Sequence, residues 1–105
     1  MDLQKVLEFR NSRNRFCHRL GIVITELSPG YAKVVKTVEE ADLNPVDIAH
    51  GGLYFSMADN AAGSAMAAYG EKAVTLNAQY NFMHPASRDP ARAAAKNKET
   101  ARFIL

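Results

Sequence analysis

A cluster of residues in the middle of the chain has the types and the spacing that acyl-transfer chemistry requires. The segment from Asn44 to Gly52 reads NPVDIAHGG, and Asp59 follows seven residues after it. A glycine pair at a helix start lets the backbone approach a ligand closely. The free N–H groups of the first turn can then donate to a carbonyl oxygen that gains negative charge. The segment therefore predicts an oxyanion site around His50, Gly51 and Gly52.

Asp59 lies in a stretch of small and apolar residues, 51–69, which predicts a long helix. Because this stretch is apolar nearly all round, we expect the helix to be buried on most sides. A carboxylate there costs free energy unless it is paired, hydrogen-bonded or functional, so Asp59 is a candidate general base or nucleophile. A membrane span is disfavoured by the central charge and by the short length.

Other interpretations of these residues are possible. The three histidines lie more than 30 residues apart and Cys17 is isolated, which predicts no metal site. A nucleophilic pair of Cys17 with His50 or His84 is conceivable, although the spacing does not support it. A purely structural interpretation also exists, in which His50 is an ordinary loop residue, the glycines form a tight turn and Asp59 faces solvent.

The elements that position the cluster follow from periodicity and turn signals. Apolar residues at helical spacing predict an amphipathic helix, β-branched and alternating runs predict strands, and Ser28-Pro29-Gly30 predicts a hairpin turn. The expected elements are a helix over 2–13, strands over 21–27 and 31–39, a loop over 41–50, the helix over 51–69 and a strand over 73–83. This order predicts an α+β fold in which a sheet packs on one central helix.

The last part of the chain is ambiguous. Asp89-Pro90 followed by an alanine-rich run resembles a helix cap with proline in the first helical position. The alternative is a hairpin with strands over 91–96 and 101–105, which is our prediction because the family resemblance given below favours it.

The composition predicts a small cytoplasmic protein. A chain of 105 residues has room for one domain, spanning 1–105, whose small core favours self-association. A net charge of +2 is too small to indicate a nucleic-acid partner. Cys17 is the single cysteine, and no signal peptide is recognisable, so we expect a cytoplasmic location without disulfides.

From about residue 20 to residue 86 the sequence resembles the hotdog-fold thioesterases of the PaaI-like and thioesterase-superfamily-member-2 group. The resemblance rests on His50-Gly51-Gly52, on Asp59 nine residues after the histidine, on Asn44 six residues before it, and on the segments 74–76 and 82–86. In that family a curved antiparallel sheet wraps one long helix. The family continues further than this chain, so the resemblance predicts that the last strand or so is missing.

The resemblance implies a site built between two subunits. Gly51 would offer its N–H to the thioester carbonyl, with Asn44 and His50 beside it. Asp59 of the partner subunit would activate water or attack directly, with Thr75 positioning it. The implied assembly is a dimer or a dimer of dimers.

The implied substrate is an acyl-CoA with an aryl or medium-chain acyl group, and neither cofactor nor metal is required. Gly52, His84, Pro85 and Arg88 would contact the substrate. The basic residues near the end of the chain are candidates for the CoA phosphates, although an ordinary solvated basic face is the more common interpretation: Arg88, Arg92, Lys96 and Lys98. The alternatives are a hotdog domain that binds acyl-CoA or an aromatic ligand without turnover, and a hydratase of the same fold.

Overall fold

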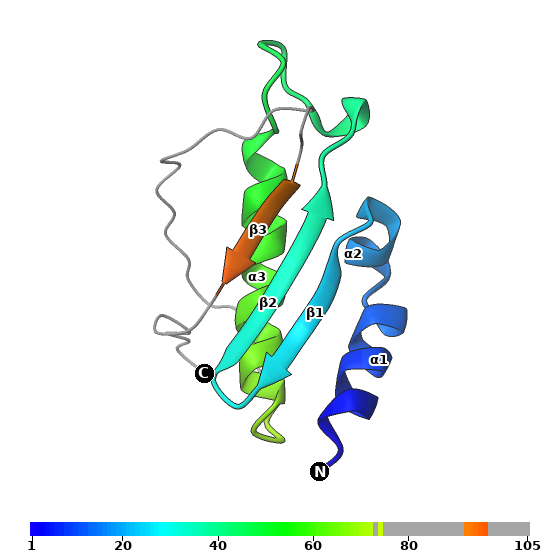
Figure 1. The fold of residues 1–105 in the computed structure, drawn as a ribbon, viewed down its shortest axis with the longest axis vertical. Helices are drawn as coiled ribbons and strands as arrows, with labels where there is room; N and C mark the ends of the chain where they lie inside the picture. The colour runs from blue at the N-terminus through cyan, green and yellow to red at the C-terminus, as the bar shows by residue number, and fades with distance from the viewer. Residues whose placement is uncertain (73, 75–91, 97–105) are drawn as a thin grey trace.

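The computed structural model describes residues 1–72, 74 and 92–96. The strands form one antiparallel sheet in the order β1-β2-β3. The long helix α3 runs along one face of this sheet, and α1 and α2 lie beside its β1 edge (Figure 1). This is the α+β arrangement predicted from the sequence. In chain order the elements are α1 (Leu3–Arg13), α2 (Arg15–Leu20), β1 (Val23–Ser28), β2 (Tyr31–Thr37), the 3-10 helix η1 (Glu40–Asp42), α3 (Gly51–Ala67) and β3 (Arg92–Lys96).

The central strand β2 presents alternate side chains to α3. Ala32, Val34 and Lys36 are buried, whereas the residues between them are only partly buried. In β1 the register shifts between Ile24 and Glu26. This shift behaves as a β-bulge, so Ile24 and Leu27 both pack on the core although they are three residues apart.

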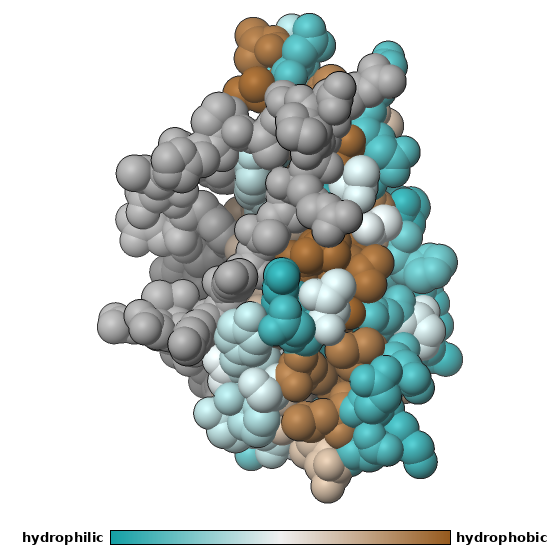
Figure 2. Space-filling model, in the orientation of Figure 1, coloured by the Kyte–Doolittle hydropathy of each residue, from teal (hydrophilic) through white to brown (hydrophobic). Residues whose placement is uncertain are grey.

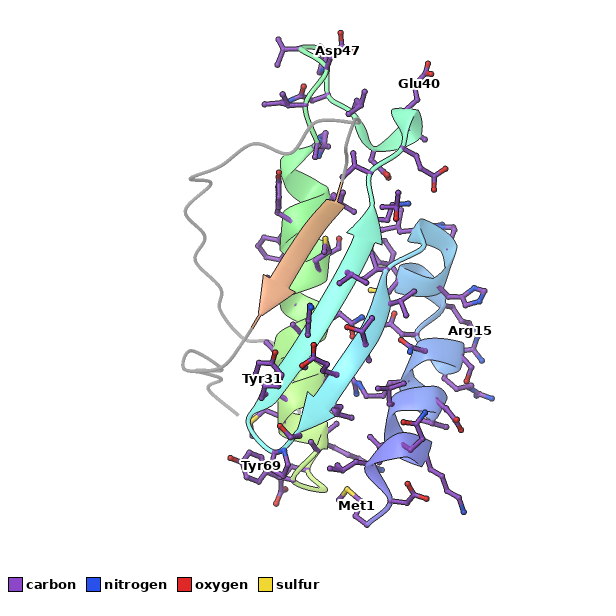
Figure 3. All side chains as sticks on the ribbon, viewed as in Figure 1. Met1, Arg15, Tyr31, Glu40, Asp47 and Tyr69 are labelled. Atoms are coloured by element: carbon purple, nitrogen blue, oxygen red, sulfur yellow. The ribbon has the colours of Figure 1, made fainter. Side chains whose placement is uncertain are left out.

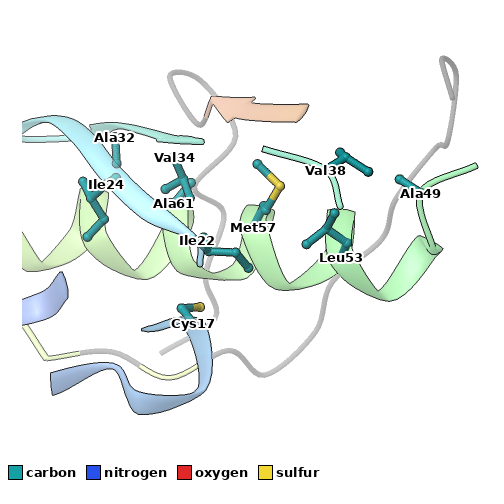
Figure 4. Packing of buried hydrophobic residues seen from close by; sticks show 11 residues of the cluster. Cys17, Ile22, Ile24, Ala32, Val34, Val38, Ala49, Leu53, Met57 and Ala61 are labelled. Atoms are coloured by element: carbon teal, nitrogen blue, oxygen red, sulfur yellow. The ribbon is translucent and has the colours of Figure 1, made fainter. Parts of the chain in front are cut away.

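Helix α3 buries one stripe against the sheet. The buried residues recur at spacings of three and four: Leu53, Met57, Asn60, Ala61, Ser64 and Ala65. Met57 and Ala61 face Val34 of the sheet (Figure 4). The remaining faces of α3 are less covered than its composition predicted, since Phe55 is 43% exposed and Asp59 is only partly buried. One chain therefore leaves a second side of this helix partly open.

The helices α1 and α2 close the edge of the sheet. The Asn11 side chain donates to the Ile24 carbonyl (3.0 Å) and accepts from the Ile24 N–H (2.9 Å), so α1 satisfies backbone groups at the β1 edge. Helix α2 was not predicted from the sequence. It begins where Asn14 accepts from the Cys17 N–H and ends at Gly21, whose φ of 74° is left-handed. For this reason β1 starts at Val23 and not at residue 21.

Most of the predicted boundaries agree with the structure. The predicted 41–50 loop contains a single bridge between Leu43 and Ala49, and its first two residues belong to η1, which was not predicted. Near the end of the chain β3 pairs with β2, so the strand prediction is confirmed over 92–96 and a helix from residue 90 onward is excluded there. The strands predicted over 73–83 and 101–105 lie outside the described residues.

The sheet face turned away from α3 carries an apolar band, flanked by the hydrophilic side chains of α1 (Figure 2). The cross-strand pair Val23 and Val35 lies on this face, and Val23 is 44% exposed. None of the helices in the described ranges has the length and apolar character that crossing a bilayer requires.

Candidate active site

The start of α3 is shaped by His50. This residue has extended backbone angles (φ −60°, ψ 139°), and its Nδ1 accepts a hydrogen bond from the Gly52 N–H at 2.8 Å. The Leu53 N–H donates to the His50 carbonyl at 2.9 Å. Among the residues that the structure describes, no acceptor is found for the N–H of Gly51, the first residue of the helix. This N–H lies at the positive end of the α3 dipole.

The imidazole ring of His50 caps the first turn of α3. Because Nδ1 accepts from Gly52, the proton of the neutral ring is on Nε2. The side chain is exposed, so Nε2 can donate to a ligand beside Gly51. The added Cβ of any other residue at position 52 would lie 3.0 Å from Nδ1, so glycine is what lets the ring lie across the helix start. His50 therefore caps the first turn of α3 through Nδ1.

Asn44 holds the preceding loop in shape. Its Oδ1 accepts from the N–H groups of Val46 (3.0 Å) and Ile48 (3.3 Å), and its N–H donates to the Ile48 carbonyl. The turn leads to Asp47, which has a left-handed φ of 62° and lies at the tip of the loop, at the far end of the molecule from Tyr69 (Figure 3). The predicted role of Asn44 beside the substrate would thus fall to its amide nitrogen, since the oxygen is used within the loop.

A buried ion pair fixes the base of the same loop. Lys36 Nζ lies 3.2 Å from Asp42 Oδ2, and both side chains are more than nine-tenths buried. Asp42 also contacts the backbone on either side of it, because its Oδ2 accepts from the Glu39 N–H and its carbonyl accepts from the His50 N–H at 2.7 Å. Lys36 and Asp42 therefore connect the end of β2 to the start of α3.

Replacing Asp42 with asparagine is expected to lower the free energy of unfolding by about 3 kcal/mol, because the Lys36 ammonium would stay buried without its nearest counter-charge. Urea unfolding measures this loss. Glu26→Gln is the matched control, since Glu26 and Lys33 form a solvent-exposed pair at 3.4 Å that contributes less than about 1 kcal/mol. Equal losses for the two variants would contradict the role assigned to the buried pair. Combining Lys36→Met with Asp42→Asn should recover part of the stability.

Asp59 lies further along the same helix. It follows Gly51 by eight residues, which is about 12 Å along the axis of α3. The structure therefore confirms that both residues belong to one helix, but it also separates them. Within one chain they do not form a compact pair.

A polar network lies next to Asp59, between α3 and the two N-terminal helices. Arg10 Nε donates to Ser64 Oγ (2.9 Å), and the Ser64 hydroxyl donates to Asn60 Oδ1 (3.1 Å). The Asn60 side chain also lowers the pKa of the Cys17 thiol. Asn60 and Ser64 are four residues apart within an apolar helix, and this spacing is the only signal in the sequence that points to the network.

Cys17 is not arranged as a nucleophile. Burial raises the pKa of its thiol, and the charge of Asp59 raises this pKa further, against smaller opposing effects of the Asn14 and Asn60 hydrogen bonds and of the Arg10 charge. Asn60, which influences the pKa of Cys17, follows His50 by ten residues or about 15 Å of helix, and this separation disfavours a Cys17–His50 pair. Within the described ranges no group of three or more histidine, cysteine or acidic side chains could hold a metal ion.

The other residues predicted for the site cannot be placed. Thr75, His84, Pro85 and Arg88 lie outside the described residues, as does Lys98. Arg92 and Lys96 begin and end β3, but only their backbone is described. The described part of the candidate site thus consists of the loop, the first turn of α3, Asp59 and the polar network.

Comparison with known proteins gives consistent matches. The family model of the thioesterase superfamily matches residues 47–103. A candidate esterase from Archaeoglobus fulgidus is 30% identical over 84 residues, which make up 80% of this chain and 54% of that protein. The E. coli PaaI protein from the phenylacetic acid degradation operon has a TM-score of 0.80 and 28% identity, covering 90% of this chain and 67% of that chain. A mutant form of PaaI from Thermus thermophilus has a TM-score of 0.70 and 31% identity, with coverages of 78% and 70%.

The match to the family model covers more than half of the chain and includes both α3 and β3. The chain therefore belongs to the thioesterase superfamily, as a hotdog-fold member of the PaaI-like type. It spans about half the length (54%) of the Archaeoglobus relative.

Proposed function

We propose that this protein hydrolyses an acyl-CoA thioester to a free acid and CoA, in a site shared by two subunits of a homo-oligomer. The Gly51 N–H of one subunit binds the thioester oxygen, and Asp59 of the partner subunit supplies the carboxylate. The proposal draws on membership of the thioesterase superfamily, on the similarity to PaaI proteins, and on the donor at the start of α3.

The observation that carries the proposal is the separation of Gly51 from Asp59. An oxygen that attacks the carbonyl carbon and a donor that binds the carbonyl oxygen must lie within about 6 Å of each other. The two residues are about 12 Å apart along one helix, and this separation supports a site in which they come from different chains. A twofold axis that sets two copies of α3 side by side and antiparallel would bring Gly51 of one chain close to Asp59 of the other.

The chemistry needs few groups. A thioester has a good leaving group, so an oriented carboxylate and a preorganised oxyanion donor can suffice without metal or cofactor. The Gly51 N–H would gain strength as the carbonyl oxygen becomes charged, helped by the positive end of α3. Asp59 would either remove a proton from the attacking water, or attack the carbon itself, breaking the C–S bond to release CoA and forming an anhydride that water then cleaves. Both routes give the free acid and CoA. The partly open side of α3 and the apolar band on the sheet are surfaces that assembly would cover.

Release of free thiol from a panel of aryl- and acyl-CoA thioesters is the test. We expect turnover of at least one of these substrates, with a rate that is proportional to enzyme concentration across the range in which the oligomer is intact. Binding of an acyl-CoA without thiol release would favour a ligand-binding domain instead. Hydration of an enoyl-CoA without thiol release would favour the hydratase chemistry of the same fold.

A further inference from the structure

Arg10 is a cation that α1 brings to the turn of α3 directly after Asp59. Its Nε is fixed on Ser64 Oγ at 2.9 Å. Its Nη2 lies against Gly63, where an added Cβ would be only 3.2 Å away. Since Gly63 follows Asp59 by four residues, the two share one face of α3 and lie one turn apart. The missing side chain at Gly63 is thus what gives the guanidinium room on this face of α3.

The helix that carries Arg10 and the Nε atom of its guanidinium are both held in place by hydrogen bonds. Asn11, the next residue of α1, holds the helix on the backbone of Ile24 through two hydrogen bonds. Because Nε is occupied by Ser64, the planar fork of Arg10 cannot swing freely, and its two terminal nitrogens keep one orientation. Arg10 is also partly buried, and a buried charge is stabilised by a nearby opposite charge.

Arg10 and Asp59 interact electrostatically. Burial lowers the pKa of Arg10, and the negative charges of Cys17 and Asp59 act in the opposite direction. The guanidinium remains charged throughout the working range of pH. The guanidinium of Arg10 and the carboxylate of Asp59 therefore attract each other.

We propose that Arg10 is the positioning residue of Asp59: anchored on Ser64 over the side-chain-free Gly63, it holds the carboxylate in place from within the same subunit. The inference rests on the proposed function, because it assigns a partner to the carboxylate of that site. Each shared site would then receive Gly51 from one subunit and the Arg10–Asp59 pair from the other. Loss of Arg10 leaves the substrate contacts at the start of α3 intact but lets the carboxylate move.

Arg10→Met is expected to lower kcat by about 10- to 100-fold with little change in KM, since a small displacement of a reacting group is enough for such a loss. Methionine keeps an unbranched apolar stem in the space of the arginine stem. Arg10→Lys retains the positive charge but lacks the planar guanidinium, so it should have an intermediate kcat. It replaces Arg10→Met as the test variant if Arg10→Met does not fold. Arg13→Met is the matched control, because Arg13 is exposed on the same helix, and it should keep the kcat of the original protein.

The double variant shows whether Arg10 acts through Asp59. In an Asp59→Asn background, Arg10→Met should lower the residual kcat by much less than it does in the original protein. An equal loss in both backgrounds would overturn the proposal. So would a folded Arg10→Met protein with unchanged kcat.

A second measurement does not depend on activity. Cys17 is the single cysteine, so a carbon-13 label on its side chain gives one signal whose pH titration reports the local charges by NMR. Asp59→Asn should lower the pKa of Cys17 because it removes a negative charge, and Arg10→Met should raise it because it removes a positive charge. Arg13→Met should leave it unchanged. If the protein turned over no thioester, this titration would still test the placement of Arg10 and Asp59. A Cys17 pKa that neither substitution moves would refute that placement.

Discussion

The Asp59→Asn variant is expected to lose about 10³-fold in kcat, with a much smaller change in KM. Asparagine has nearly the same size as aspartate but can neither accept a proton from water nor attack a carbonyl, and losses of this order follow the removal of a general base or nucleophile. Substrate contacts at the start of α3 would remain, because Gly51 and His50 do not depend on this carboxylate for their geometry. Steady-state kinetics on the best thioester of the panel would measure the change.

A control variant separates chemistry from stability. Asp2 caps α1 by accepting from the N–H groups of Gln4 and Lys5, and asparagine caps helices about as well as aspartate. Asp2→Asn makes the same chemical change far along the chain from α3, and it should leave both kcat and the melting temperature nearly unchanged. If Asp59→Asn shifted the melting temperature but left the kcat of the folded protein intact, Asp59 would be structural and the proposed mechanism would be wrong.

The sequence predicts the central features of this fold well because they are encoded locally. The hairpin of β1 and β2 follows from β-branched runs on either side of Ser28-Pro29-Gly30, and α3 follows from its small and apolar residues. The glycine pair after His50 correctly marks the start of α3. This local pattern cannot predict the distance between residues of two different subunits.

Strand β3, in contrast, is not encoded by its local sequence. Its sequence, RAAAK, has a high helix propensity and follows a helix-cap signal, yet it pairs with residues 33–37 of β2. The backbone ladder with a distant strand outweighs the local preference, since alanine costs little in either conformation when the strand is paired. This prediction depended on the family resemblance and not on propensity.

Two features were missed for physical reasons. Helix α2 has six residues, less than two turns, so no periodicity could appear, and only Asn14 and Gly21 at its ends mark it. The network of Arg10 with Ser64 joins residues 54 positions apart, and no local pattern encodes such a contact. The polar residues Asn60 and Ser64, four positions apart in an apolar helix, indicate that a polar side chain from another element contacts them. They do not identify that side chain.

The Gly51→Pro variant is expected to lose about 10²- to 10³-fold in kcat, the range observed when one oxyanion donor is removed. Proline removes the N–H and puts its ring in that place, and it is well tolerated at the first position of a helix. The backbone angles of His50 already suit a residue that precedes proline. The N–H removed has no acceptor among the described residues, so the fold should lose no hydrogen bond there. Gly51→Ala, which keeps the donor, is the control and should retain much more activity.

A mixed dimer of the Asp59→Asn and Gly51→Pro variants tests whether the active site is shared between subunits. In a dimer assembled from one Asp59→Asn subunit and one Gly51→Pro subunit, one site would carry both substitutions and the other neither, so a purified mixed dimer should have about half the activity of the original. If each site lay within one chain, the mixed dimer would be inactive, because each of its two sites would carry one of the two substitutions. Mixed dimers that are isolated with two affinity tags and remain inactive would refute the pairing of Gly51 with Asp59 of the partner subunit. Restored turnover would establish that the 12 Å separation along α3, estimated from about 1.5 Å per residue, is bridged by assembly.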